Sequence, residues 1–338
     1  MAVDYGALKT SEAAQAKGMG IKTQTEPGLA KQKRKNSIAE AAQSPDEWLD
    51  ESDEELDWIY EDLIYKNTVT IVDSIGGSGK TTLGMQIGIG AALGLPFMGL
   101  SRFKYSNPEP ARVLYLNGED PRKILKKRFR AICARHAADD QLSKEQIKDA
   151  ARRMKIVAAE DCGHNLCLVG EDGRATVTYR DLCEFADDFR PDIIFIDSLI
   201  NFYGADENRS SHGRAFYSLL LKLGATVIIM HHQNKAALNG GDLSAASRGT
   251  MVFREQARTR LCLVTDRESK DKHIEIEKMN YAPTAGIKIS ISYDRGAWKA
   301  ATEDMDRNIR RHQAESDRKR AKKQQKQAVD MEDIYEKF

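Results

Sequence analysis

The stretch "SIGGSGKTT" at residues 74–82 decides the fold. The apolar run "TVTIV" comes just before it, and "GKTTLGMQIGIGAALG" continues from it as a helix-like segment. A strand, a glycine-rich turn and a helix in this order build a phosphate-binding loop, whose backbone N–H groups face phosphate oxygens. Lys80 would reach the β- and γ-phosphates, and the Thr81 hydroxyl would ligate Mg²⁺. The expected nucleotide-binding residues are Ser74, Gly76, Gly77, Ser78, Gly79, Lys80, Thr81 and Thr82.

One position departs from the usual pattern G-x-x-x-x-G-K-[ST], because Ser74 stands where the first glycine is expected. The remaining glycines still supply the backbone freedom that the chain needs where it wraps the phosphates. Accommodating a serine at the entry to the turn is a smaller demand than losing Gly79 or Lys80. We therefore expect a working site for ATP and Mg²⁺.

Length and composition limit the protein class. The chain has 338 residues, of which 41% are hydrophobic, and this is enough for one substantial core with tails. The formal net charge of +1 indicates no particular partner. Five scattered cysteines do not make a disulfide framework, and no signal peptide or long apolar run is visible. These features favour a soluble, cytoplasmic protein.

The composition also divides the chain. Residues 1–50 predict a flexible arm, residues 51–300 a folded ATPase domain, and residues 301–338 a charged tail. Strand-like runs within the domain alternate with helix-like segments, and hairpin-like spacing joins the last three. The pattern predicts an α/β fold with a mostly parallel twisted sheet, flanked by helices and extended by antiparallel edge strands. The predicted strands are "TVTIVDS", "RVLYLNGED", "KIVAAED", "DIIFIDS", "TVIIMHH", "RTRLCLVTD", "HIEIEKMN" and "IKISISYD".

Acidic residues follow two of these strands. "DIIFIDS" has the pattern of a Walker B strand, whose Asp197 would hold Mg²⁺ directly or through water. The next residue is Ser198 and not a glutamate, so the catalytic base must come from elsewhere. Glu119 in "VLYLNGED" can orient and polarise the attacking water. Asp120 is the alternative base, or a helix N-cap before "PRKILKKRF".

Two histidines end the strand "TVIIMHH". His231 or His232 would lie near the γ-phosphate and sense the nucleotide through one hydrogen bond, or either would be a buried histidine without that role. The polar, glycine-bearing stretch "NKAALNGGDLSAAS" that follows is typical of a mobile loop. Such a loop, following a nucleotide sensor, can couple hydrolysis to a bound strand.

The motifs "SIGGSGKTT", "VLYLNGEDP", "IIFIDSL", "MHHQNK", "SRGT" and "KMNYAP" together resemble the RepA-type plasmid replicative helicases, a branch of the RecA/DnaB-like ATPases. The resemblance spans roughly residues 55–300 and includes a loop that begins with serine. It implies a RecA-like P-loop core, the catalytic glutamate at Glu119, and a ring-shaped homohexamer with ATP between subunits.

The resemblance also implies a cation that the neighbouring subunit supplies to the γ-phosphate, an arginine finger. Arg258 matches this position by its spacing from "SRG", with Arg248 and Arg254 as competitors. Lys278 in "KMN" matches the first member of a K-x-R pair in related ring helicases. Asn280 stands where the second member would be.

Contacts with single-stranded DNA are less clearly marked. The family lines its channel with the loops after the Walker B strand and after the histidines, and the candidates there are Lys235, Arg209 and Arg214. The basic segment 307–326 would add non-specific affinity or form a solvated helix or tail. The acidic end "MEDIYEKF" is a hypothetical docking tail for other replication proteins. "DCGHNLC" lacks the paired spacing of a zinc site.

The sequence therefore predicts an ATP-driven helicase of DNA replication that acts as a ring. Two alternatives remain: a RecA-like recombination or repair ATPase that does not unwind DNA, and a regulatory ATPase whose nucleotide site controls assembly.

Overall fold

A computed structural model describes residues 42, 44–49, 54–163, 166–206, 209–232, 248–266 and 269–301. The chain divides into two units, Met1–Glu55 and Leu56–Phe338. The described part of the first unit holds one short 3-10 helix, η1 (Glu47–Leu49). Most of the predicted arm, Lys235, His164, the segment 307–326 and "MEDIYEKF" lie outside the described residues.

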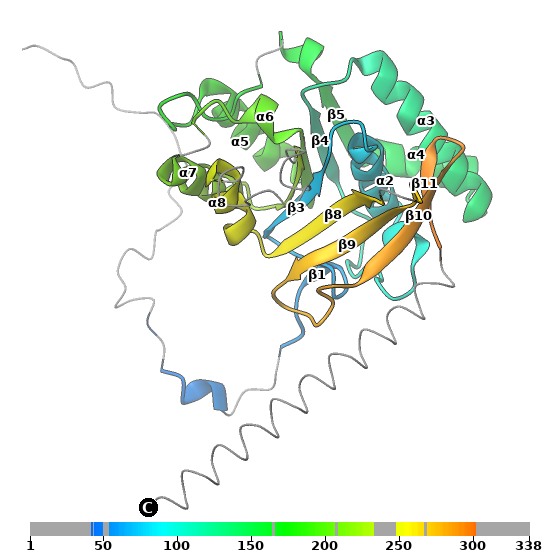
Figure 1. The fold of residues 1–338 in the computed structure, drawn as a ribbon, viewed down its shortest axis with the longest axis horizontal. Helices are drawn as coiled ribbons and strands as arrows, with labels where there is room; N and C mark the ends of the chain where they lie inside the picture. Colours follow the sequence, from blue (N-terminus) through cyan, green and yellow to red (C-terminus); the bar gives the residue numbers. More distant parts are fainter. Residues whose placement is uncertain are drawn as a thin grey trace, which may run out of the picture. The chain divides into compact units, whose positions relative to one another are not determined.

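The second unit is built on a nine-stranded sheet among its described residues, in the order β11-β10-β9-β8-β3-β7-β6-β4-β5 (Figure 1). The strands from β8 through β3, β7, β6 and β4 to β5 are parallel, whereas β9, β10 and β11 are antiparallel. The strands are β3 (Val69–Ser74), β4 (Val113–Asn117), β5 (Met154–Ala158), β6 (Ile193–Asp197), β7 (Thr226–His232), β8 (Thr259–Thr265), β9 (Lys272–Met279), β10 (Lys288–Asp294) and β11 (Ala297–Ala300). The predicted parallel sheet with an antiparallel edge is confirmed.

All eight predicted strands are present, but three further strands were not predicted. A two-stranded hairpin, β1 (Trp58–Tyr60) and β2 (Ile64–Tyr65), precedes the sheet, and β11 closes its antiparallel edge. Strands of two to four residues are too short for period-2 alternation to be recognised.

Helices cover both faces of the sheet, so the buried strands carry apolar side chains in both directions. One face packs on α2 (Lys80–Ala92), α3 (Arg122–Asp139) and α4 (Lys144–Arg152), the other on α5 (Val177–Phe189), α6 (Leu199–Phe202), α7 (Ser210–Leu221) and α8 (Arg248–Gln256) (Figure 1). Successive residues alternate between the two cores, as Val113 and Tyr115 against Leu114 and Leu116 show. Short 3-10 helices complete the unit, η2 (Phe97–Gly99) and η3 (Ala159–Cys162).

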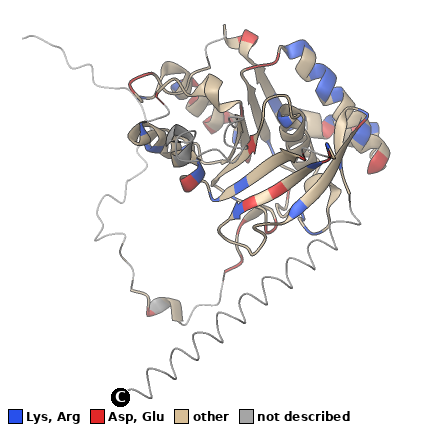
Figure 2. Ribbon diagram, in the orientation of Figure 1, with Lys and Arg blue, Asp and Glu red and all other residues tan. Residues whose placement is uncertain are grey.

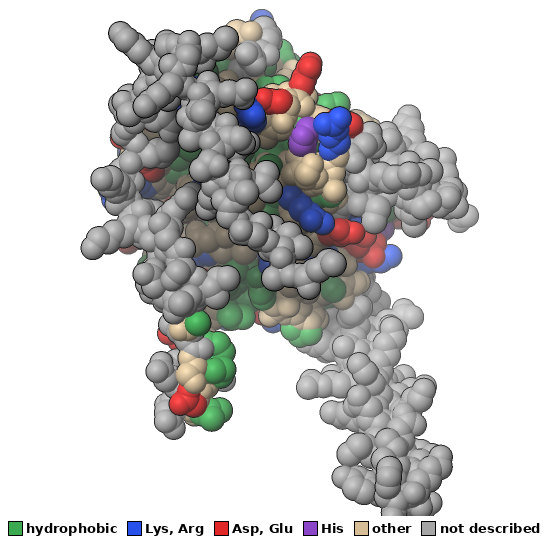
Figure 3. All heavy atoms as spheres, turned by 90° about the vertical axis from the view of Figure 1, so that its left-hand side faces the viewer, with side chains coloured by type: hydrophobic (Ala, Val, Ile, Leu, Met, Phe, Trp, Pro, Cys, Tyr) green, Lys and Arg blue, Asp and Glu red, His purple; other side chains and the backbone are tan. Residues whose placement is uncertain are grey.

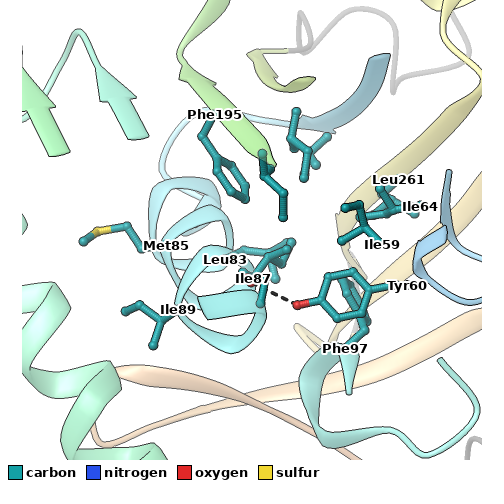
Figure 4. Close-up of a cluster of buried hydrophobic side chains, with 14 of the residues drawn as sticks. Ile59, Tyr60, Ile64, Leu83, Met85, Ile87, Ile89, Phe97, Phe195 and Leu261 are labelled. Carbon is teal, nitrogen blue, oxygen red and sulfur yellow. Dashed lines mark hydrogen bonds between the residues drawn. The ribbon is translucent and has the colours of Figure 1, made fainter. Parts of the chain in front are cut away.

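The core around α2 extends to the β1–β2 hairpin. Tyr60 is fully buried there, and its hydroxyl donates a hydrogen bond of 3.1 Å to the Ile87 carbonyl in the helix (Figure 4). Burial raises the pKa of Tyr60, so the phenol remains a neutral donor. This contact ties the start of the domain to the helix that follows the phosphate loop. Among the described helices, none is both long and apolar enough to cross a membrane.

Candidate nucleotide site

The phosphate loop connects the carboxyl end of β3 to the start of α2. Gly77 and Gly79 have φ angles of 74° and 97°, in the left-handed region that favours glycine, so the turn needs them. Ser74 is instead the last residue of β3, paired with His232 in β7 and with Leu263 in β8. The position requires no glycine, because its backbone is that of an ordinary strand residue. This explains how the loop accommodates a serine there.

Lys80 begins α2 and is nearly buried, with 4% of the residue exposed. Its Nζ atom lies 2.9 Å from Nε2 and 3.3 Å from Nδ1 of His232 at the end of β7. Burial lowers the pKa of Lys80, and the charges of Asp197, Glu119 and Asp73 act against this lowering. The predicted lysine, glutamate and histidine are thus brought together at the carboxyl end of the sheet.

Glu119 follows β4 and faces this group. Its Oε1 atom accepts a hydrogen bond from the Ser198 hydroxyl and lies 3.1 Å from His232 Nε2. Burial alone would raise the pKa of Glu119, but the hydrogen bonds from Ser198 and His232 and the charge of Lys80 lower it below its usual value. Glu119 is therefore ionised at neutral pH and able to accept a proton.

Asp120, the alternative base, points elsewhere and pairs with Arg128 of α3. Its predicted role as a helix N-cap is wrong, because Pro121 occupies the N-cap and no side chain caps α3. The Asn117 Oδ1 atom holds the turn instead, accepting the N–H groups of Glu119 and Asp120 at 3.1 and 2.7 Å. This hydrogen bonding separates the two carboxylates, so that Glu119 alone faces His232.

Asp197 ends β6 and is fully buried. Its Oδ2 atom accepts hydrogen bonds from the Tyr115 hydroxyl at 2.8 Å and from the Asn117 amide at 3.0 Å. Burial raises the pKa of Asp197, while Lys80, Tyr115 and Thr81 act in the opposite direction. The other oxygen, Oδ1, is buried and accepts no hydrogen bond from the described residues. An unshared carboxylate oxygen beside the Thr81 hydroxyl is a donor set that suits Mg²⁺.

The two histidines have different surroundings, because successive strand residues point to opposite faces. His232 faces Lys80 and Glu119, whereas His231 lies 2.6 Å from Asp73 in the neighbouring β3. Asp73 is fully buried and also pairs with Arg260 of β8, which in turn pairs with Glu277 of β9. Burial alone would raise the pKa of Asp73, but His231, Arg260 and Arg254 lower it to about 2.

Sequence reasoning missed this buried charge network. A possible signal was Asp73 itself, because a carboxylate inside an otherwise apolar strand needs a cationic partner. Among the described residues, Asp73, Cys262 and Glu277 are also spaced for a metal ion, but Arg260 already bridges the two carboxylates. The network is therefore an ion-pair cluster beneath the phosphate loop.

The predicted finger residues lie at the opposite end of the sheet. Arg258 is exposed, and its backbone N–H bonds to the carbonyl of Val69, the first residue of β3. Ser74 is five residues after Val69 in β3, so the Val69 carbonyl lies about 16 Å from Ser74, where the phosphate loop begins. Lys278 lies beside Arg258 and donates to the Glu255 carbonyl at 2.7 Å. Burial and the charge of Arg258 lower the pKa of Lys278.

The two competitors for the finger differ from Arg258. Arg254 is oriented toward the buried Asp73, 3.8 Å away. The side chain of Arg248 lies outside the described residues. Among the described candidates, Arg258 alone is exposed.

The described DNA candidates lie on α7. Arg209 precedes the first residue of this helix, Arg214 lies in its second turn, and both are exposed. On the side of the molecule drawn in Figure 3, basic and acidic side chains are interspersed among the described residues. The structure also shows a strongly basic helix, α3, that sequence analysis did not single out (Figure 2). Its exposed cations are Arg122, Lys123, Lys126, Lys127 and Arg130.

Comparisons with known proteins found a similar solved structure and a matching family model. The KaiC-like protein PH0186 from the hyperthermophilic archaeon Pyrococcus horikoshii OT3 is similar at 14% identity, over 72% of this chain and 93% of that chain, with a TM-score of 0.47. A search of curated proteins found no match. The AAA_25 family model, described as "AAA domain", matches residues 35–237, more than half of the chain and the part that contains Lys80, Glu119 and Asp197. The chain therefore belongs to the AAA_25 family of AAA domains, and it has the fold of a RecA-like P-loop ATPase.

Proposed function

We propose that the protein is an ATP-driven DNA helicase or translocase that acts on single-stranded DNA in replication, with ATP hydrolysed between the subunits of a homohexameric ring. One observation carries this proposal. Lys80, Glu119 and His232 gather at the carboxyl end of the sheet, whereas the exposed Arg258 and the half-buried Lys278 lie at its amino end. An arginine that cannot reach its own phosphate loop is suited to the loop of a neighbouring subunit.

The chain's own residues supply most of the chemistry of hydrolysis. Lys80 and the N–H groups of the phosphate loop bind and orient the phosphates. Glu119, held by Ser198, positions a water molecule and takes its proton. Thr81 and Asp197 would hold Mg²⁺, which when bound neutralises phosphate charge.

His232 connects nucleotide to DNA in this proposal. It ends β7 and contacts both Lys80 and Glu119, so a change at the phosphates alters its hydrogen bonds. The segment that follows it contains Lys235, one of the three DNA candidates. Arg209 and Arg214 on α7 would contact backbone phosphates. Sequence-independent contacts of this kind suit a motor that moves along any strand.

The motifs that resemble RepA-type helicases favour this reading over two alternatives. A recombination or repair ATPase would have the same nucleotide site but would pair strands without unwinding. A regulatory ATPase would hydrolyse ATP slowly and without response to DNA. Acidic residues near the end of the chain keep other replication proteins as candidate partners.

The test measures ATP hydrolysis with and without single-stranded DNA, unwinding of a forked duplex, and particle mass by native mass spectrometry. Lys80→Ala is the inactive control. We expect DNA to stimulate hydrolysis, a hexamer to form and the fork to be unwound. Hydrolysis that does not respond to DNA would favour the regulatory ATPase, and strand pairing without unwinding would favour the recombination ATPase.

A further inference from the structure

The antiparallel edge of the sheet touches the phosphate loop directly. Trp298 of β11 packs on Gly79, so closely that a Cβ atom built on the glycine would lie 2.5 Å from the indole Cζ2 atom. The indole Nε1–H donates to the Gly79 carbonyl at 3.2 Å. Strand β11 is separated from β3 by three other strands, so sheet pairing does not explain this contact.

Gln86 of α2 fixes the position of Trp298. The buried Gln86 amide donates to the Trp298 carbonyl at 2.7 Å and accepts the Trp298 N–H at 2.8 Å. Both polar groups of the side chain are thus paired with one backbone residue, as a neighbouring strand would pair with it. The indole is therefore held against the start of the helix that carries Lys80.

A second contact comes from Lys272 at the start of β9. Its Nζ atom donates to the Ser78 carbonyl at 2.8 Å and lies 5.2 Å from the centre of a Trp298 ring. The ammonium therefore contacts both the loop and the aromatic ring that packs on the loop. Beside these contacts is a hollow of about 460 Å³, lined by Gly77, Lys272, Tyr293 and Trp298 among others.

These contacts help to fix the orientation of two peptides of the phosphate loop. A trans peptide directs its carbonyl and its N–H in opposite directions. The Ser78 carbonyl shares a peptide with the Gly79 N–H, and the Gly79 carbonyl shares one with the Lys80 N–H. Lys272 holds the Ser78 carbonyl, whereas the Gly79 carbonyl is held by Trp298 together with α2, because it also accepts the Leu83 N–H at 3.1 Å. With both carbonyls held in this way, we expect the two N–H groups to point away from these partners and toward bound phosphates.

We propose that Lys272 and Trp298 are positioning residues for ATP, which hold the peptides of the phosphate loop so that their N–H groups face the phosphates. This proposal rests on the nucleotide binding described under "Proposed function". The two residues act on the loop from β9 and β11, which belong to the antiparallel part of the sheet. A movement of these antiparallel strands would accordingly alter ATP binding without any change in Lys80.

The experiment compares the ATP affinity and turnover of the wild-type protein with those of Lys272→Met, Lys272→Arg and Trp298→Phe. Lys299→Met is the matched control, since Lys299 lies on β11 next to Trp298 and is exposed. Isothermal titration gives the Kd for ATP, steady-state hydrolysis gives KM and kcat, and thermal unfolding without nucleotide checks the fold.

We expect Lys272→Met to raise Kd and KM about tenfold with little change in kcat, because the contact acts on bound phosphate before the chemical step. Lys272→Arg should restore most of the affinity, since its guanidinium can donate to the Ser78 carbonyl, and Lys299→Met should match the wild type. Trp298→Phe should lose affinity for ATP. It should also show a smaller change in tryptophan fluorescence when ATP is added, because the Trp298 indole no longer contributes.

Wild-type affinity in both Lys272→Met and Trp298→Phe would overturn the positioning role. An equal loss in Lys299→Met would also overturn it, because the loss would then be a general charge effect. A wild-type protein that binds no ATP would instead refute the proposed function itself.

Discussion

The Nζ atom of Lys80 lies 2.9 Å from Nε2 of His232. The same ring nitrogen lies 3.1 Å from Glu119 Oε1. A single imidazole nitrogen carries a proton and donates, or carries none and accepts, but does not do both. His232 therefore donates from Nε2 to the Glu119 carboxylate or accepts at Nε2 from Lys80. The two hydrogen bonds at Nε2 are alternatives, and when Nε2 donates to Glu119, Lys80 can donate only to Nδ1, 3.3 Å away. This exchange gives the histidine a physical means of responding to the nucleotide.

Replacing His232 should separate catalysis from binding. We expect His232→Ala to lower kcat by about tenfold or more while ATP affinity stays near that of the wild type, because Glu119 loses the partner that orients it. His232→Gln, which keeps one donor and one acceptor, should retain more turnover than the alanine variant. Steady-state hydrolysis and a direct ATP titration check this. Equal turnover in the wild type and His232→Ala would show that the ring has no part in hydrolysis.

Glu119 should be essential and its neighbour dispensable. Glu119→Gln removes the proton acceptor but keeps the shape of the side chain, so we expect kcat to fall about 10²- to 10⁴-fold with ATP binding preserved. Asp120→Asn is the matched control, because Asp120 pairs with Arg128 and does not face the site. If Asp120→Asn lost turnover and Glu119→Gln kept it, the assignment of the base would have to be reversed.

Much of this site follows from the sequence for a geometric reason. Parallel strands bring their carboxyl ends to one edge of the sheet, so Lys80, Glu119 and Asp197 are predicted to meet there without knowledge of the packing. Which histidine joins them was not predictable. Alternation places His231 and His232 on opposite faces, but only the packing of β3 against β7 shows that Asp73 takes the first.

Contacts across the antiparallel strands were equally beyond prediction. The Arg260–Glu277 pair depends on the pairing of β8 with β9, where the register shifts after Arg260. Trp298 reaches Gly79 only because the outer strand packs back on α2 through Gln86. Neither feature is encoded in a local motif, since the first depends on the register of two strands and the second on how β11 lies against α2.

The buried Asp73 should stabilise the protein in a pH-dependent way. Its pKa is about 2 in the folded protein against an ordinary value of 3.8, so the stabilisation is present above pH 3.8 and is lost as pH falls through about 2. This difference corresponds to about 2 kcal/mol. Denaturant unfolding at a series of acidic pH values should show the loss in the wild type and not in Asp73→Asn.

The two buried carboxylates Asp73 and Asp197 should respond differently to neutralisation, because their partners differ. At neutral pH, Asp73→Asn should lower the free energy of unfolding by about 3 kcal/mol, because Arg260 loses a buried partner. Asp197→Asn is the contrasting variant. Burial raises the pKa of Asp197, so neutralising it should not destabilise the nucleotide-free protein, although it should abolish Mg²⁺-dependent hydrolysis. A large destabilisation by Asp197→Asn would contradict this account.

The two arginines on α7 give a test of DNA binding. We expect Arg209→Ala combined with Arg214→Ala to weaken binding of single-stranded DNA and to reduce the slope of its salt dependence by about 2, because each arginine would neutralise one phosphate. Lys123→Ala combined with Lys126→Ala on α3 removes the same charge from exposed positions elsewhere. Equal losses of affinity in both double variants would mean that binding reflects overall charge, and a loss only in the α3 variant would place the DNA on that helix.

The position of Arg258 predicts complementation between subunits. Arg258 lies at the amino end of its own sheet, so its guanidinium would serve the phosphate loop of a neighbour. Arg258→Ala should assemble normally and bind ATP but lose about 10³-fold or more in turnover.

Lys80→Ala should be inactive because its own phosphate loop is damaged. When the two variants are mixed and allowed to exchange subunits, some interfaces combine an intact Lys80 with an intact Arg258, and hydrolysis should reappear above the level of either variant alone. If Arg258→Ala keeps full turnover, or if mixed rings of confirmed composition remain inactive, Arg258 does not act across an interface. The half-buried Lys278 beside it then becomes the residue to test in the same way.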